Sequence, residues 1–388
     1  MFDFYYQSID FANSSQKLVV DKALKCSKLT SQCLANFIFQ HNVFFKTFKK
    51  DKACKFPIKF CLRIVAKTFI HWMFRCVYRI NRFHLPERTK LIKSWVEINV
   101  TEWEQNIDLQ TSTVLVLPFS IDFFRQWNYI QFLRNEKVSH TLYGYNYSFY
   151  KLLVFCIKRD MNSLLDLEIH AQKHYVRDII NSNCKELYVM DDVEFYSHYS
   201  NSLLKRLGVN VYFTAHGIGC YSPYYSCTHY KLFNDSQVSF FRQFNFLVSY
   251  DVKYQPSGKF KVSDIENFHA VCFISQLSKT QSSEYSLIED RLLSSIKCSS
   301  HTNLDLLFKK HPNSQSIDCP SGYREIDKLE TYKGKILFLT LYSTAYYTFQ
   351  KYGQTVLIET TDLNPSNIFG SNERVILENE LDKLLSRN

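Results

Sequence analysis

Five residues near the middle of the chain could act on a substrate, and they follow two apolar runs: Asp191, Asp192, His216, Gly217 and Gly219. A carboxylate or a neutral imidazole can serve as a general base, and two adjacent carboxylates raise one another's pKa. Glycine lets a ligand approach the backbone closely. The aspartates could also cap the next helix, and the histidine could be a turn residue. The choice of base among Asp191, Asp192 and His216 therefore stays open.

Basic, amide and hydroxyl residues follow three apolar runs of the second half: Ser275, Gln276, Lys310, His311, Pro312, Ser343 and Thr344. An ammonium and an imidazole can neutralise a phosphate, and hydroxyls at a helix start form an anion site with free N–H groups. Taken singly, Pro312 can simply end a strand and Ser343 can simply cap a helix. Together they predict a phosphate site opposite a base, which is the layout of a transferase with an activated phosphate donor.

Parallel strands are the elements that could bring these residues together. From residue 111 onward, short apolar runs alternate with amphipathic stretches, as in βαβ units, and open α/β sheets bind ligands at the carboxyl ends of their strands. Expected strands are Thr113–Leu117, Glu186–Met190, Val209–Thr214, Phe246–Ser249, Val271–Ser275, Leu304–Phe308, Ile336–Leu339 and Thr355–Ile358. Expected helices are 121–135, 147–158, 165–181, 194–207, 282–298, 344–352 and 377–387.

The length of 388 residues suggests about two domains of ordinary size. A hydrophobic content of 46%, with only 9 Gly and 8 Pro, excludes a disordered or collagen-like chain. We predict an α/β protein with two Rossmann-like domains facing a cleft. The first spans 111–255 and would bind the acceptor, and the second spans 256–388 and would bind the nucleotide donor. The linker-like segment Lys253–Lys259 separates them.

Residues 1–110 form a basic segment that we expect to be mostly helical. They hold 18 Lys and Arg against 9 Asp and Glu, a net charge of +9, whereas the other residues hold 29 against 28, a net of +1. Within 44–93, basic residues recur among bulky apolar ones, as in an amphipathic helix that lies on an anionic membrane. The alternative is a helix packed on the protein with its arginines in solvent. Nucleic acid is the least favoured partner, because no nucleic-acid motif accompanies the charge.

The 12 cysteines include no CxxC pair and several lie in apolar runs, which favours free thiols in a reducing cytosol over disulfides or zinc. No D-x-D motif stands at a clear strand end, so we expect metal-independent chemistry with no cofactor besides the donor substrate. Met1–Gln7 shows no signal peptide, and no apolar run reaches the length of about 18 residues that a membrane span needs. These features predict a cytoplasmic protein, peripheral at the inner membrane.

Three segments of the second half resemble a known family: Val271–Gln276, Leu306–Pro312 and Tyr342–Ala345. They look like the C-terminal half of bacterial GT-B glycosyltransferases with CMP-activated donors, the sialyltransferases and polysialyltransferases of capsule and lipooligosaccharide synthesis. The resemblance implies a GT-B-like architecture. It also implies that His311–Pro312 and Ser343–Thr344 are the HP and S-S/T motifs that bind CMP.

The same resemblance implies that Asp191–Asp192 is the acidic motif that supplies the base, although Val193 stands where that motif has glycine. It further implies transfer of sialic acid or a related ulosonic acid to a surface-glycan acceptor, so the expected partners are a nucleotide sugar and a glycan. The resemblance covers roughly residues 111–360.

Two alternatives remain. Thr214–Gly217 is similar to the HG motif of CDP-glycerol glycerophosphotransferases of teichoic acid synthesis, in which the histidine is a candidate base. On that interpretation the protein is a CDP-polyol phosphotransferase and His216 is its base. The other alternative is a non-enzymatic basic binding protein that acts through residues 44–93.

Overall fold

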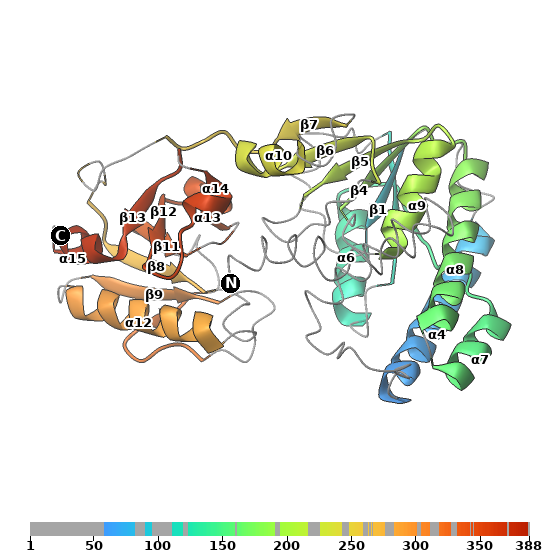
Figure 1. The fold of residues 1–388 in the computed structure, drawn as a ribbon, viewed down its shortest axis with the longest axis horizontal. Helices are drawn as coiled ribbons and strands as arrows, with labels where there is room; N and C mark the ends of the chain where they lie inside the picture. The colour runs from blue at the N-terminus through green and yellow to red at the C-terminus, as the bar shows by residue number, and fades with distance from the viewer. Residues whose placement is uncertain are drawn as a thin grey trace, which may run out of the picture.

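A computed structural model shows two lobes, each built on its own β-sheet (Figure 1). The residues that the structure describes are 58–81, 90–94, 111–118, 123–159, 161–190, 195–215, 226–242, 248–258, 263, 265, 267–275, 283–300, 304–310, 318–326, 332–341, 343, 345–370 and 372–386.

The first lobe contains a seven-stranded sheet, sheet A, in the order β3-β2-β1-β4-β5-β6-β7. All of its strand pairs are parallel. Strand β1, the first of the described strands, lies in the interior, and later strands continue outward from it on both sides. The strands are β1 (Lys90–Ser94), β2 (Thr113–Val116), β3 (His140–Leu142), β4 (Glu186–Val189), β5 (Asn210–Thr214), β6 (His229–Leu232) and β7 (Ser249–Val252).

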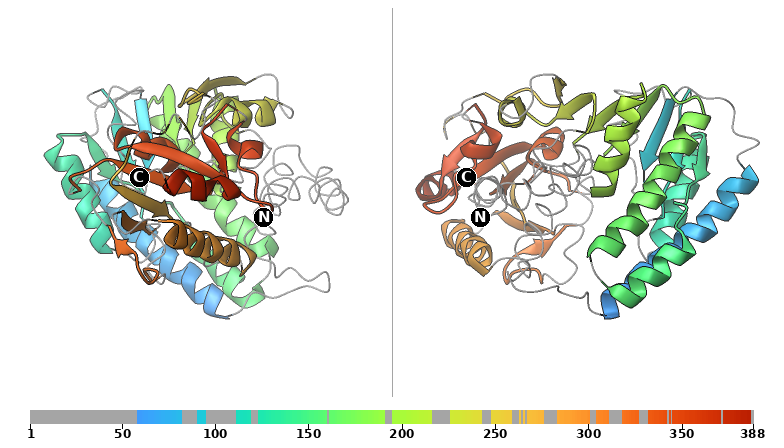
Figure 2. Two further views of the ribbon diagram at one scale, coloured as in Figure 1. Left: turned by 90° about the vertical axis from the view of Figure 1, so that its left-hand side faces the viewer. Right: turned by 45° about the vertical axis from the view of Figure 1, so that its right-hand side comes forward.

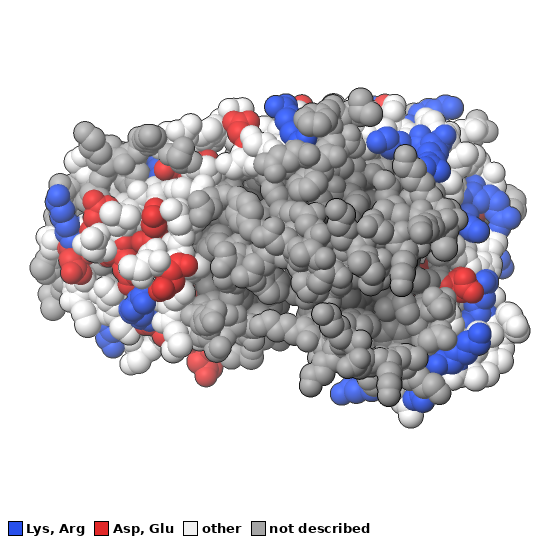
Figure 3. Space-filling view, in the orientation of Figure 1, with Lys and Arg blue, Asp and Glu red and all other residues white. Residues whose placement is uncertain are grey.

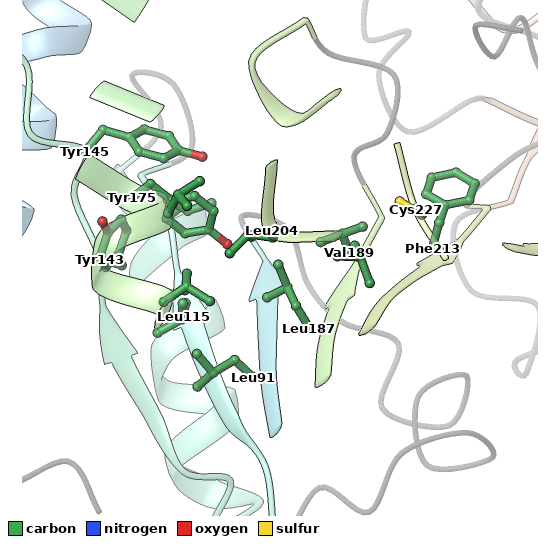
Figure 4. Close-up of a cluster of buried hydrophobic side chains, with 14 of the residues drawn as sticks. Leu91, Leu115, Tyr143, Tyr145, Tyr175, Leu187, Val189, Leu204, Phe213 and Cys227 are labelled. Atoms are coloured by element: carbon green, nitrogen blue, oxygen red, sulfur yellow. The ribbon is translucent and has the colours of Figure 1, made fainter. Parts of the chain in front are cut away.

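Helices cover both faces of sheet A, because alternate strand residues point to opposite sides. On one face Ile92, Val114 and Val116 pack with side chains of α6 (Phe123–Asn135). The other face carries α4 (Ile58–Asn81), α7 (Phe149–Lys158), α8 (Met161–Asn181) and α9 (Phe195–Arg206). Figure 4 shows part of the core beneath these helices, in which Leu91, Leu115 and Leu187 of the sheet lie near Tyr143 and Tyr175.

The second lobe contains a six-stranded parallel sheet, sheet B, in the order β10-β9-β8-β11-β12-β13. Every residue of β8 and β11 is buried, as expected for a parallel sheet covered on both faces. On one face α12 (Ser283–Ser299) and α15 (Leu381–Leu385) complete the core. The strands are β8 (Ala270–Ile274), β9 (Asp305–Lys309), β10 (Arg324–Glu325), β11 (Ile336–Thr340), β12 (Gln354–Glu359) and β13 (Val375–Leu377).

Two parallel, doubly wound sheets confirm the prediction of an α/β protein with two Rossmann-like units. The cleft between them stays a prediction. The predicted helical segment 1–110 contains β1, an interior strand of sheet A that the sequence analysis does not foresee. Strand β7 begins at Ser249 and therefore lies three residues closer to the C-terminus than the predicted strand Phe246–Ser249. Also unforeseen are β3, β6, β10, β13 and the helix α10 (Asp235–Arg242).

Within the basic segment, residues 58–81 form helix α4, but Arg75 does not lie in solvent. Its guanidinium is buried and pairs with the Asp178 carboxylate of α8. The Tyr143 hydroxyl donates to the same carboxylate over 2.7 Å. Part of the arginine face therefore packs into the lobe. In the described part of the chain, no helix is long and apolar enough to span a membrane.

The buried side chain of His71 on α4 gives the first lobe a pH dependence. Its Nδ1 accepts the backbone N–H of Tyr145 over 3.2 Å, which requires this nitrogen to be unprotonated. Burial, with Lys67 and Lys93 nearby, lowers the pKa of His71 well below its usual value. The unfolded chain therefore binds more protons than the folded one once the pH falls below about 6.5, the ordinary histidine value.

We expect stability to be complete above that pH and to fall as the pH drops below it, by at most about 1.4 kcal/mol per pH unit. Urea unfolding at a series of pH values from neutral downward measures this slope. His71→Gln, which keeps an acceptor but does not titrate, should flatten it. The prediction fails if the slope is the same in both proteins.

A polar joint connects the lobes near α10. Asn234 donates to the Tyr347 hydroxyl and to the Phe369 carbonyl of the second lobe, both over 3.1 Å. The Tyr347 ring stacks on Tyr254 of the connecting segment at 4.6 Å between centroids. At its centre the buried Glu373 carboxylate accepts from both Tyr346 and Tyr347 hydroxyls and from the backbone N–H of Ser257.

Candidate active site

The two segments proposed to carry the base follow adjacent strands of sheet A. Strand β4 pairs with β5, with Val189 opposite Phe213 near their carboxyl ends. Asp191 and Asp192 follow β4, and His216, Gly217 and Gly219 follow β5. All five lie outside the described residues. The structure describes the two neighbouring strands that precede them.

A row of planar side chains crosses sheet A close to these strand ends. Tyr188, Tyr212 and His229 occupy paired positions on β4, β5 and β6. Their rings stack at 4.7 and 4.4 Å between centroids, with interplanar angles of 13° and 8°. Sequence reasoning missed this row. The signal was available, because Tyr188 and Tyr212 stand at similar distances from the ends of two predicted strands.

The three segments proposed to bind the donor also follow adjacent strands. Strands β9, β8 and β11 are consecutive in sheet B, and Ile274 lies opposite Lys309 at the carboxyl ends of β8 and β9. Ser275, Lys310 and Ser343 therefore extend from one edge of the sheet. The motif residues outside the described part are Gln276, His311, Pro312 and Thr344.

Ser275 is turned toward the interior of the second lobe. Its hydroxyl is fully buried and donates to the Glu289 carboxylate of α12 over 2.7 Å. Its backbone N–H donates to the Lys309 carbonyl over 3.0 Å. In this conformation Ser275 anchors the end of β8 to a helix and to the neighbouring strand.

Ser343 caps a short helix, α13 (Ala345–Thr348). Its hydroxyl accepts the backbone N–H of Ala345 over 3.1 Å, and its carbonyl accepts that of Tyr346 over 2.9 Å. A single 3₁₀ turn, Phe349–Lys351, continues the helix. Ser343 is therefore a helix cap, as one of its two interpretations predicts, and it follows the carboxyl end of β11, the neighbour of β8.

Lys310 already has an anionic partner in the protein. Its ammonium lies 2.7 Å from the Glu325 carboxylate of β10. The hydrogen bond that it donates there raises the pKa of Lys310, so the group is charged at neutral pH. A phosphate at this strand end would compete with Glu325 for the ammonium.

The described residues contain no cluster of three or more His, Cys, Asp or Glu side chains that could hold a metal ion. None of the described cysteines forms a disulfide. Burial raises the pKa of Cys272, in the middle of β8, to about 12. That thiol is therefore protonated at neutral pH and behaves as a small apolar core residue.

No protein-family model matches the chain, and no curated protein matches it. Among solved structures, the spinosyn rhamnosyltransferase SpnG complexed with thymidine diphosphate is similar at 9% identity and a TM-score of 0.38, over 77% of this chain and 90% of its own. MurG of Acinetobacter baumannii is similar at 8% identity and a TM-score of 0.42, over 77% of this chain and 89% of its own. Both TM-scores are low. The order and direction of the strands in the two sheets define the fold.

Proposed function

We propose that the protein is a glycosyltransferase that transfers a sugar, sialic acid or a related ulosonic acid, from a CMP-activated donor to a surface-glycan acceptor. One observation carries the proposal: the three donor motifs extend from three consecutive strands, β9, β8 and β11, at one edge of sheet B. In the sequence, a lysine, a histidine and a capped helix start follow these strand ends, and groups of this kind suit a phosphate. The two segments with candidate bases extend from adjacent strands of sheet A.

In the proposed reaction, Asp191, Asp192 or His216 takes the proton from an acceptor hydroxyl. The hydroxyl oxygen forms a bond to the anomeric carbon of the donor sugar as the bond from that carbon to the CMP phosphate oxygen breaks. CMP leaves with the electron pair of the broken bond. Lys310 and His311 offset the charge that develops on the phosphate, and Ser343 with Thr344 holds it in place.

Nucleotide binding tests this proposal most directly. Ligand-detected NMR with CMP, CDP, UDP and GDP on the wild type should show a preference for CMP. His311→Ala should weaken CMP binding by about tenfold or more, because a charge-assisted hydrogen bond to the phosphate is lost. His269→Ala is the matched control, since His269 lies just before β8, at the opposite end of the same strands. Absence of binding by every nucleotide, or equal CMP binding by His311→Ala, would overturn the proposal.

The pairing of β4 with β5 also supports the CDP-polyol phosphotransferase interpretation, because the His216 and Asp191–Asp192 segments follow neighbouring strands in the sequence. This reaction would use His216 as the base and a CDP donor. A preference for CDP, together with activity lost in His216→Ala and kept in the Asp191→Asn and Asp192→Asn variants, would select it. The opposite pattern would select the ulosonic-acid transferase.

A further inference from the structure

Helix α4 exposes an apolar stripe along the side that faces away from the protein. Its inner side is buried and includes Cys61, Ile64, Phe74 and Tyr78. The exposed side should be polar in an ordinary surface helix. Instead, large apolar residues recur on it at intervals of three and four, and Leu62, for example, is 63% exposed. The stripe consists of Ile58, Leu62, Val65, Phe69 and Met73.

Helix α7 adds a second exposed stripe beside the first. Its residues are Phe149, Tyr150, Leu153 and Ile157. Trp72 of α4 joins the two, because its ring lies 6.3 Å from that of Phe149 and its indole N–H donates to the Tyr147 carbonyl over 3.0 Å. We call these nine residues the α4–α7 patch.

The α4–α7 patch concentrates most of the exposed apolar side chains of the described structure. It holds nine of the fourteen large apolar residues that are exposed there, although the two helices contain 24 and 10 residues. In both Figure 1 and Figure 2, α4 lies on the outside of the first lobe, away from the second lobe. A cluster of this kind on one surface marks an interaction site.

The exposed charges on α4 and α7 are all positive. The sequences of α4 and α7 contain no Asp or Glu, and four of their basic residues are exposed: Lys59, Arg63, Arg79 and Lys158. On the adjacent helix α8, Glu168 and Asp178 are turned inward and pair with Lys67 and Arg75, whereas Asp166 is exposed. Figure 3 shows Lys and Arg gathered on the first lobe and Asp and Glu on the second.

We propose that the α4–α7 patch docks the protein onto an anionic lipid bilayer, with α4 lying in the plane of the membrane surface. An apolar stripe flanked by the exposed cations of α4 and α7 complements a membrane of anionic headgroups, since the stripe enters the acyl boundary while the cations contact phosphates. Helix α4 is about 36 Å long at the usual rise per residue, and its five basic residues oppose a crossing orientation.

This proposal does not depend on the proposed transferase function, because membrane docking requires no nucleotide and no catalysis. It narrows the expectation that a helix within 44–93 lies on an anionic membrane to the exposed apolar side of α4 and adds α7 to the contact. Arg75 is buried against Asp178, so the apolar stripe provides the contact area and Lys59 and Arg63 lie at its margin.

Vesicle flotation of the full chain, without nucleotide, tests the proposal. We expect the wild type to bind vesicles of equimolar phosphatidylglycerol and phosphatidylcholine and to bind pure phosphatidylcholine weakly. Leu62→Ser combined with Phe69→Ser should reduce partitioning by about tenfold or more, because two large apolar side chains no longer enter the membrane. Lys59→Glu combined with Arg63→Glu should reduce binding only to the anionic vesicles.

Leu287→Ser is the matched control, since Leu287 of α12 in the second lobe is 71% exposed and lies outside the patch. Thermal unfolding should show that all variants fold. Failure of the wild type to bind vesicles overturns the proposal. Unchanged binding by both patch variants also overturns it, and would assign membrane docking to the chain before Ile58. A wild-type dimer that Leu62→Ser/Phe69→Ser converts to monomers, without vesicle binding, would instead show a contact between two copies.

Discussion

Replacing Asp178 by alanine is expected to lower the free energy of unfolding of the first lobe by about 3–5 kcal/mol. The Asp178 carboxylate accepts from Arg75 and from the Tyr143 hydroxyl, and all three groups are largely buried. Its removal leaves a guanidinium without its counter-charge in a protein interior, which costs far more than the loss of an exposed ion pair. Denaturant unfolding followed by circular dichroism measures the loss.

Asp166→Ala provides the control, because Asp166 is an exposed aspartate on the same helix. It should change stability by no more than about 0.5 kcal/mol. Combining Arg75→Met with Asp178→Leu should recover much of the stability lost in Asp178→Ala, since a buried ion pair replaced by apolar side chains of similar volume is often neutral. An equal free energy of unfolding for Asp178→Ala and the wild type would show that the Arg75–Asp178 pair does not stabilise the packing of α4.

Replacing Glu373 by alanine is expected to lower the free energy of unfolding by about 3 kcal/mol or more. Three donors lose their acceptor together, namely the hydroxyls of Tyr346 and Tyr347 and the N–H of Ser257. Since Ser257 belongs to the segment that connects the lobes, we also expect the lobes to unfold less cooperatively. Differential scanning calorimetry should resolve two transitions in the variant.

The comparison for Glu373 is Glu378→Ala in the same lobe. Glu378 pairs with Arg291 at the surface, with N–O distances of 2.9 Å, and the arginine side chain is 47% exposed. An exposed pair of this kind contributes about 0–1 kcal/mol. If Glu373→Ala is no more damaging than Glu378→Ala, the joint does not hold the lobes together.

Sequence reasoning succeeded where burial on both faces leaves a continuous apolar run. Strands β8 and β11 are such runs, and each lies within a residue or so of its predicted bounds. Strand β1 was missed because its sequence, KLIKS, contains two lysines. Lys93 is nevertheless buried. Its ammonium donates to Ser197 over 3.1 Å and lies above the rings of Tyr145 and Tyr175.

The same limit applies to the candidate site. The residues that follow the apolar runs could be inferred, so the sequence assigns the motifs to strand ends, but it does not predict the order of the strands in either sheet. The partners of those residues could not be inferred, because they come from distant segments. Glu325 beside Lys310 and Glu289 beside Ser275 are examples. Likewise the spacing of arginines on α4 could not reveal Asp178, which lies 103 residues after Arg75.

The strand orders of both sheets bear on how the protein is made by the ribosome. In sheet A the earliest of the described strands, β1, lies in the interior, and in sheet B the same holds for β8. Each later strand adds outward from one already synthesised, so neither sheet requires a gap to be opened between paired strands. The first lobe can assemble its strands before β8 is translated, in keeping with domains that fold in the order of their synthesis. Tyr346, Tyr347 and Glu373 are synthesised after every strand of sheet A. The polar joint therefore forms on a first lobe whose strands are already in place.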